Sequence, residues 1–283
     1  MAVAYASHQT ATSNTIGAGL TITKPTSLAV GDLMIAFLWG GRNAGDWSTL
    51  SGWTKLGSAV TTDGTDANMT VLAKVADSGD TAASDFTFTP HASHEEKFGL
   101  VARITGTFSA GIGSLIVSDF DTDVTSSATG GVTPVAANSL LLMGVINHTA
   151  AAAGGGNAVT NNNPSWTTQV ADFVNTAVDM GYNLATATFT VSTATGGYSW
   201  SNGALSGACL ISVSESTDVT VSPTVISTTM NIIAPTVTGG ATVTPAVIGL
   251  TATVQAPTVT TAEPKWKNPD KSSAPNWSNP DKS

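Results

Sequence analysis

Short segments with an apolar residue at every second position recur along residues 1–215, separated by clusters of Gly, Asp, Asn and Ser. In residues 69–75, Met69, Val71, Ala73 and Val75 alternate with Thr70 and Lys74, and residues 85–89 place Phe86 and Phe88 between polar neighbours. A period of two predicts strands with one buried and one solvated face. Residues 168–180 come closest to a helical pattern, but Thr and Val dominate them. The clearest predicted strands are Leu20–Thr23, Leu33–Trp39, Met69–Val75, Phe86–Thr89, Leu100–Ile104, Leu115–Val117, Leu140–Ile146, Tyr182–Ala187, Phe189–Ser192 and Ala208–Val213.

Two of these strands, Leu33–Trp39 and Leu140–Ile146, are apolar on both faces. A strand in a sheet with one solvated face carries polar residues at alternate positions. Either another part of the chain or another subunit must therefore cover the second face. The second alternative is a reason to expect an oligomer.

The two halves of residues 1–215 resemble one another. Residues 31–37 (Gly-Asp-Leu-Met-Ile-Ala-Phe) resemble residues 138–144 (Asn-Ser-Leu-Leu-Leu-Met-Gly), and Ser-Gly-Trp-Thr at 51–54 resembles Pro-Ser-Trp-Thr at 164–167. Two related Greek-key halves that close into a jelly roll would produce this pattern, and so would two separate small sandwiches. We predict an all-β fold, a jelly-roll-like β-sandwich of two Greek-key halves over residues 1–215, followed by an extended repetitive C-terminal arm.

The arm over residues 216–262 contains a direct repeat. Val-Ser-Pro-Thr-Val-Ile at 221–226 matches Val-Thr-Pro-Ala-Val-Ile at 243–248, and Pro223 and Pro245 are 22 residues apart. Proline on this spacing removes ladder donors and favours extended chain. Two repeats of this length cannot bury a core alone. The arm is therefore expected to be disordered or to lie on other subunits.

A tandem peptide fills residues 263–283: Trp-Lys-Asn-Pro-Asp-Lys-Ser at 266–272 returns, with one substitution, at 277–283. No local core can bury these two tryptophans, and Trp is a typical interface anchor where a pocket receives it. We expect two equivalent pockets on neighbouring subunits; the alternative is a disordered tail. The predicted anchor and interface residues are Trp266, Asn268, Pro269, Lys271, Trp277, Asn279, Pro280 and Lys282.

Charged residues make up 10% of the chain, well below the roughly 25% of an ordinary soluble domain. Thr, Ala, Ser, Val and Gly replace them, of which Thr and Val fit a pleated sheet. The formal net charge of −9 argues against nucleic-acid binding, because phosphates demand Lys and Arg. Residues 265–283 are net positive, which would allow the tail of one copy to dock on the acidic body of another; ordinary solvated charge is the alternative.

The single cysteine, Cys209, excludes an internal disulfide and is expected to be a small core residue. No apolar run reaches about 18 residues, so no membrane insertion is predicted. Residues 1–14 lack the basic start and apolar run of a signal peptide. We therefore expect assembly in a cytoplasm.

Few residues of the chain are candidates for a catalytic or metal-binding site. His91, His94, Glu95 and Glu96 lack the order of a zinc-protease helix and are interpreted as a solvated loop, with a metal site as the alternative. The alternating residues Asp119, Asp121 and Asp123 are weak calcium candidates, since the Gly and Glu of an EF-hand are missing. The histidines lie in no Ser or Cys nucleophile motif. We predict no enzyme and no cofactor, although distant paired carboxylates of a hydrolase escape sequence patterns.

Trp47 and Trp53 lie in the Gly-, Asn- and Ser-rich segment 40–58. Aromatic residues at the rim of a sandwich often form sugar platforms, although most pack in a core or a turn. These two tryptophans are the candidate glycan contacts.

The "GDL" strand at 31–33, the "GWT" turn at 52–54 and the strand that ends at Lys74 resemble β-sandwich domains of tailed-bacteriophage structural proteins. The tandem Trp peptide is also similar to short tryptophan repeats at the ends of some phage virion proteins. The resemblance covers residues 20–105 and, by motif alone, residues 265–283. It implies a virion appendage or decoration such as a tail fibre, tail-tip protein, head fibre or capsid decoration protein, and it transfers no catalytic residue.

The expected function is therefore structural: a virion surface protein, assembled in the host cytoplasm and anchored by its arm. Expected partners are other virion proteins and copies of the chain itself, with a trimer favoured, and a host surface glycan. The alternative is a carbohydrate-binding module of a bacterial surface protein.

Overall fold

The computed structural model describes residues 3–62, 66–108, 112–148, 155–174, 180–201 and 204–215. The predicted arm (216–262) and anchor peptide (263–283) thus lie outside the described residues. The elements are β1 (Ala4–Ser13), β2 (Leu20–Thr23), β3 (Leu33–Gly41), β4 (Thr54–Thr61), β5 (Ala67–Val75), α1 (Ser78–Ala82), β6 (Asp85–Phe88), β7 (Lys97–Thr105), α2 (Ile112–Leu115), β8 (Ile116–Thr125), β9 (Ser127–Ala128), β10 (Ser139–Asn147), β11 (Ala158–Val159), β12 (Thr167–Val174), β13 (Met180–Phe189), β14 (Tyr198–Ser199) and β15 (Leu205–Val213).

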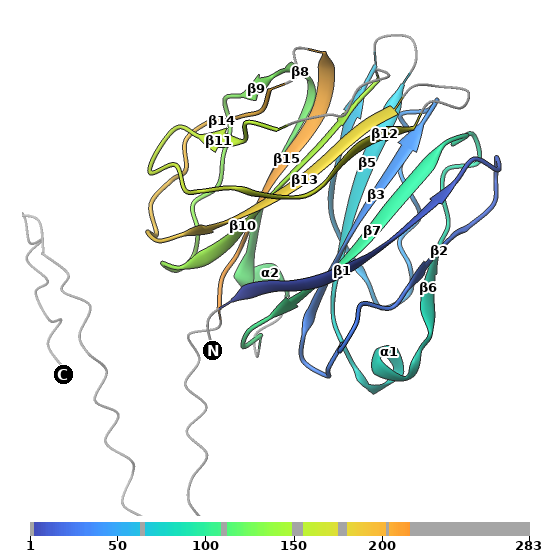
Figure 1. Ribbon diagram of the computed structural model, residues 1–283, viewed down its shortest axis with the longest axis horizontal. Helices are drawn as coiled ribbons and strands as arrows, with labels where there is room; N and C mark the ends of the chain where they lie inside the picture. The colour runs from blue at the N-terminus through green and yellow to red at the C-terminus, as the bar shows by residue number, and fades with distance from the viewer. Residues whose placement is uncertain are drawn as a thin grey trace, which may run out of the picture. The chain divides into compact units, whose positions relative to one another are not determined.

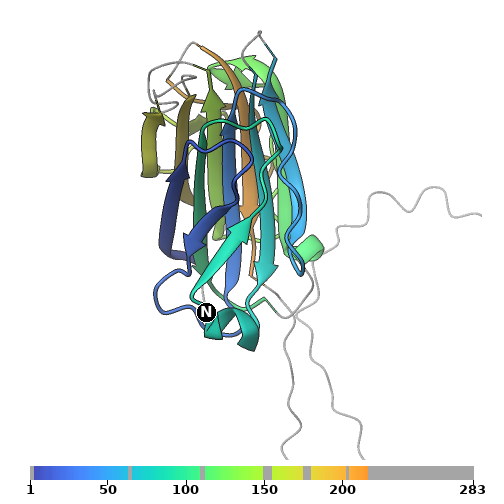
Figure 2. The ribbon, with the colours of Figure 1, turned by 90° about the vertical axis from the view of Figure 1, so that its right-hand side faces the viewer.

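Two antiparallel five-stranded sheets form the body of the protein, face to face as a β-sandwich (Figures 1 and 2). The first sheet has the order β4-β5-β3-β7-β1, and the second has the order β12-β13-β10-β15-β8. Both central strands, β3 and β10, are buried along their whole length. The prediction of an all-β sandwich is confirmed.

The chain pairs its strands in the same order twice. The first sheet lies within residues 4–105 and the second within residues 116–213, and β3 occupies in one the place that β10 occupies in the other. A small pair, β2 with β6, accompanies the first sheet, and β9 pairs with β14 beside the second. The sequence similarity between 31–37 and 138–144 thus corresponds to equivalent central strands.

This arrangement corrects the predicted jelly roll. In a jelly roll each sheet takes strands from both halves of the chain, whereas here each half supplies one complete five-stranded sheet. Neither sheet contains three consecutive strands joined as neighbouring hairpins, which a Greek key requires; β3, for instance, pairs with β5 and not with β4. Sequence similarity revealed the duplication but carried no information on which strands pair.

The interior between the two sheets is a single apolar core. Trp39 of β3 and Phe98 of β7 pack against Tyr182 of β13, with Phe98 and Tyr182 stacked at 3.9 Å between ring centroids. The indole Nε1 of Trp39 donates a hydrogen bond across the interior to the carbonyl oxygen of Val145, at 3.1 Å. Because the two halves share this core, the alternative of two separate small sandwiches is wrong.

A second apolar layer covers the outer face of each sheet. Over the first sheet, Leu20, Ile22, Phe86 and Phe88 pack with Trp53 on the outward side chains of β3. Residues of β9, β11 and β14 cover the second sheet in the same way. The chain itself therefore covers both faces of the two all-apolar strands, and the pattern that suggested a partner subunit is explained within one molecule.

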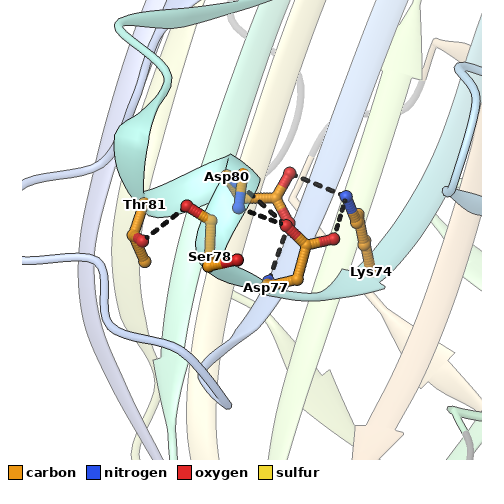
Figure 3. A network of polar contacts seen from close by, with 6 residues as sticks. Lys74, Asp77, Ser78, Asp80 and Thr81 are labelled. Atoms are coloured by element: carbon orange, nitrogen blue, oxygen red, sulfur yellow. Dashed lines mark hydrogen bonds and ion pairs between the residues drawn. The ribbon is translucent and has the colours of Figure 1, made fainter.

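The outer layer also changes the surroundings of residues predicted to face solvent. Thr70 is fully buried, and its hydroxyl accepts a hydrogen bond from the backbone N–H of Trp47. Lys74 lies between the carboxylates of Asp77 and Asp80, at 3.1 and 2.7 Å (Figure 3). Asp77 is the N-cap of α1 and completes a capping box with Asp80, which fixes this turn after β5.

Several strands differ from the predicted set. Residues 4–13, 54–61 and 167–174 form β1, β4 and β12, the three edge strands whose apolar pattern is weak. The predicted strand Phe189–Ser192 is absent among the described residues, because β13 ends at Phe189. Edge strands have fewer buried positions than central ones, and this explains why alternation revealed the centre of each sheet and missed its borders.

Candidate functional site

A groove with a volume of about 460 Å³ opens between the two sheets, along β1 on one side and β12 and β13 on the other. Its walls combine small side chains with hydroxyl and amide groups. The lining residues are Val3, Ala4, Tyr5, Leu140, Ser165, Thr167, Gln169, Thr186, Ala187 and Thr188. A concave site of this size on a rigid sandwich is a candidate binding site.

The opposite border of the sandwich is closed. There β4 lies against β8 and β15. A Cβ atom at Gly207 would lie 2.8 Å from the backbone of Ala59 and Val60, and one at Gly57 would lie 2.5 Å from the ring of Phe120. Glycine at these two positions lets the sheets approach closely on this side.

Polar groups with spare hydrogen-bonding capacity line the groove. The Tyr5 hydroxyl is buried and has no hydrogen-bond partner, and burial raises the pKa of this phenol. Gln169 donates through its amide nitrogen to the Thr186 hydroxyl at 2.8 Å, which leaves the Gln169 carbonyl as an acceptor. The Tyr5 hydroxyl is enclosed, so the groups that the groove offers to a bound polar group are the Gln169 carbonyl and the exposed hydroxyls of its lining.

The groove lies close to the point where the described chain ends. Leu140, in its lining, pairs directly with Val213 of β15. The hydroxyls of the neighbouring residues Ser139 and Ser214 are hydrogen-bonded at 2.7 Å. The last described residues, 213–215, thus lie one strand away from this lining residue.

Trp47 and Trp53, the predicted glycan contacts, are buried at 2% and 6% exposure. Trp53 packs edge-on against Phe86 and Phe88, and Trp47 lies against His94. A sugar platform needs an accessible ring face, which neither indole offers. The assignment of these two residues to glycan binding is therefore wrong, and both belong to the outer apolar layer.

The three aspartates of β8 diverge. Asp121 accepts a hydrogen bond from the Tyr198 hydroxyl at 2.7 Å, while Asp123, at a bulge with φ of 54°, accepts the backbone N–H of Thr62 at 2.7 Å. Burial, and then the charge of Asp121, raises the pKa of Asp119. The bulge breaks the alternation on which the calcium candidate depended. Within the described ranges, no three metal-ligating side chains lie together.

The segment 91–96, interpreted as a solvated loop, is only partly exposed: Ala92 and Ser93 are exposed, whereas other side chains are enclosed. His94, Glu96 and Lys97 are fully buried. The Lys97 ammonium donates to three carbonyl oxygens, the nearest being that of Thr15 at 2.6 Å. The His94 ring packs on Gly40, and its Nε2 lies 3.2 Å from the carbonyl oxygen of Asn43. These contacts give the segment a structural role at the end of β7.

Stability should fall on acidification because of His94. Burial lowers the pKa of this imidazole to about 4, so the folded state holds it neutral while the unfolded chain protonates it near pH 6.5. Stability is then full above pH 6.5 and is lost as the pH falls toward 4, by roughly 2 kcal/mol at pH 5. Urea unfolding at pH 7 and pH 5 measures this loss. His94→Phe should reduce the difference between the two pH values; an unchanged difference would contradict the assignment to His94.

Of the remaining sequence predictions, one concerns a described residue, Cys209, and the others concern residues outside the described ranges. Cys209 is fully buried, as expected of a small core residue, and burial raises the pKa of its thiol to about 12. Every predicted anchor residue, from Trp266 to Lys282, lies outside the described residues. In the described part of the chain no helix is long and apolar enough to cross a membrane.

The sequence did not predict the groove. Its residues come from β1, β10, β12 and β13, and each of them alone resembles an ordinary polar strand position. No motif links Tyr5 to Gln169, because the pairing of the sheets brings them together. Comparisons of this chain with models of protein families, with curated proteins and with solved structures find no match.

Proposed function

We propose that this protein is a non-enzymatic structural component of a phage-type virion, a surface appendage or decoration of the head or tail, held in place by its C-terminal arm. The observation that carries the proposal is the tandem Trp peptide of residues 263–283, attached to a sandwich that needs no partner to cover its apolar faces. A sandwich complete in itself leaves the arm as the segment that requires outside contacts.

The fold supports this proposal in a second way. The two halves share one core, the closed border is sealed by close glycine contacts, and β1 and β12 stand at the open border. A rigid body that carries a separate anchoring segment is well suited to display on an assembled particle. The resemblance of the 31–33 and 52–54 motifs to phage structural proteins points to the same class.

Attachment to host glycans would require residues other than Trp47 and Trp53. Trp47 and Trp53 are buried, so the carbohydrate-binding alternative loses the residues on which it depended. We therefore keep the structural role as the proposal and give glycan binding no assigned residue.

Deleting residues 261–283 should abolish incorporation into particles, because both Trp anchors are lost while the sandwich stays folded. The measurement is the amount of protein that sediments with purified particles, for the full chain and for the truncated chain. A double variant, Trp266→Ala with Trp277→Ala, should reproduce most of the loss, and the full-length variant Asp270→Asn with Asp281→Asn serves as its matched control. Normal incorporation of the truncated chain would show that the arm is no anchor.

A further inference from the structure

We propose that the groove between β1 and β12 receives an extended strand from the arm of a second copy of this chain, the hexapeptide Val-Thr-Pro-Ala-Val-Ile at 243–248. The inference rests on the proposed function in one respect: the arm acts outside its own sandwich. It adds the binding site and the segment that fills it.

The borders of the groove carry open backbone edges. Among the described strands, β1 pairs with β7 alone and β12 pairs with β13 alone, so the outer N–H and C=O groups of both strands have no strand partner. An exposed edge recruits an extended peptide by β-augmentation, in which main-chain hydrogen bonds supply affinity and side-chain pockets supply specificity. Two such edges on either side of one groove favour an extended peptide over a compact ligand.

The lining suits a strand with small side chains. Thr167, Thr188 and Ser165 present hydroxyls and little bulk, and the unpartnered Tyr5 hydroxyl lies buried beside them. The exposed hydroxyls of Ser165, Thr167 and Thr188 can pair with the backbone of an inserted strand. No lining residue carries a formal charge, in agreement with the uncharged hexapeptide.

The hexapeptide has the composition of an edge strand. Val and Ile favour the pleated conformation, and Pro245 is tolerated where the missing donor points away from the partner strand. Six residues extend over about 20 Å.

The length of chain that follows the described sandwich allows the second of the two repeats to reach a second copy. Val243 follows Glu215 by 28 residues, enough to span up to about 90 Å, whereas residues 221–226 begin about 20 Å of chain after Glu215. A reach of about 90 Å is long enough for the hexapeptide to enter the groove of a neighbouring copy. Arms passed from each copy to the next form a heterologous contact that can close into a ring, such as the favoured trimer.

Cross-linking of two separately purified full-length chains tests this proposal. One chain carries Thr167→Cys and the other carries Val247→Cys; the native Cys209 is fully buried in both. On mixing and mild oxidation, a disulfide-linked dimer should form between the two chains. Thr168→Cys is the matched control, because Thr168 is exposed and pairs with Ala185 on the outer side of the sheet. We expect at least a tenfold lower yield from Thr168→Cys.

A charge placed in the groove gives an independent readout. Thr167→Glu should raise the concentration needed for self-association by tenfold or more, while Thr168→Glu should leave it unchanged. Equal cross-linking at positions 167 and 168, or a disulfide that forms only within a chain carrying both cysteines, would overturn the proposal. Both measurements use purified protein without particles, so they can fail while particle incorporation still depends on residues 261–283, and the reverse also holds.

Discussion

Replacing Trp39 by alanine should lower the free energy of unfolding by about 3–5 kcal/mol, the range for a large buried aromatic side chain. Trp39 is fully buried between the sheets, with the rings of Phe37, Phe98 and Tyr182 at 5.3–5.7 Å. The substitution also removes the hydrogen bond to the carbonyl oxygen of Val145, which connects the two halves. Urea denaturation followed by circular dichroism measures the change.

The contacts of Trp39 also predict the number of unfolding transitions of the variant. Since its contacts lie in both halves, the variant should still unfold in one transition, shifted as a whole to lower urea. Phe173→Ala is the control, because Phe173 is 42% exposed, and its effect should stay within about 0.5 kcal/mol. A Trp39→Ala protein that unfolds in two separate steps would show that the halves are independent domains.

Gly207→Ala should destabilise the sandwich by about 3 kcal/mol or more, a large effect for one added methyl group. The new Cβ would lie 2.8 Å from two backbone atoms of β4, which cannot rotate away as a side chain would. Relief of this clash requires separation of β15 from β4 along the closed border. Thermal and urea unfolding of the purified variant measure the loss.

Gly113 provides the matched control for this substitution. A Cβ atom there meets nothing within 4 Å, so Gly113→Ala should change stability by less than about 0.5 kcal/mol. If Gly207→Ala were as stable as Gly113→Ala, the closed border would tolerate movement, and the contrast between a closed and an open side of the sandwich would be lost.

The sequence predicted the central strands of both sheets because the burial of these strands depends on the residues within them. Continuous apolar runs such as 33–39 and 140–146 can only be buried, and the alternation of Phe86 and Phe88 with polar neighbours places them correctly on the buried face of β6. The likeness between 31–37 and 138–144 corresponds to equivalent strands for the same reason. Burial of such segments is decided by their own residues.

Other features depend on contacts between distant residues. Trp47 lies in a Gly- and Asn-rich segment that resembles an exposed rim, yet its backbone N–H binds Thr70 and its ring is enclosed with His94. No sequence pattern near Asp123 predicts the bulge that directs its carboxylate toward Thr62. The groove likewise exists because two edge strands from different halves border one opening, which no local pattern encodes.

The duplicated sandwich changes where association between copies should originate. Its apolar strands are covered within the chain, so we assign the proposed association to the arm and to the open edges of β1 and β12. If the arm connects the copies, the sandwich alone should be a monomer and the full chain an oligomer.

Light scattering on size-exclusion fractions of residues 1–215 and of the full chain tests this account most directly. We predict that residues 1–215 are a folded monomer across the accessible concentration range, and that the full chain is a homo-oligomer, with a trimer favoured. A full chain that remains monomeric, or an oligomer that persists in residues 1–215, would contradict the claim that the arm joins the copies.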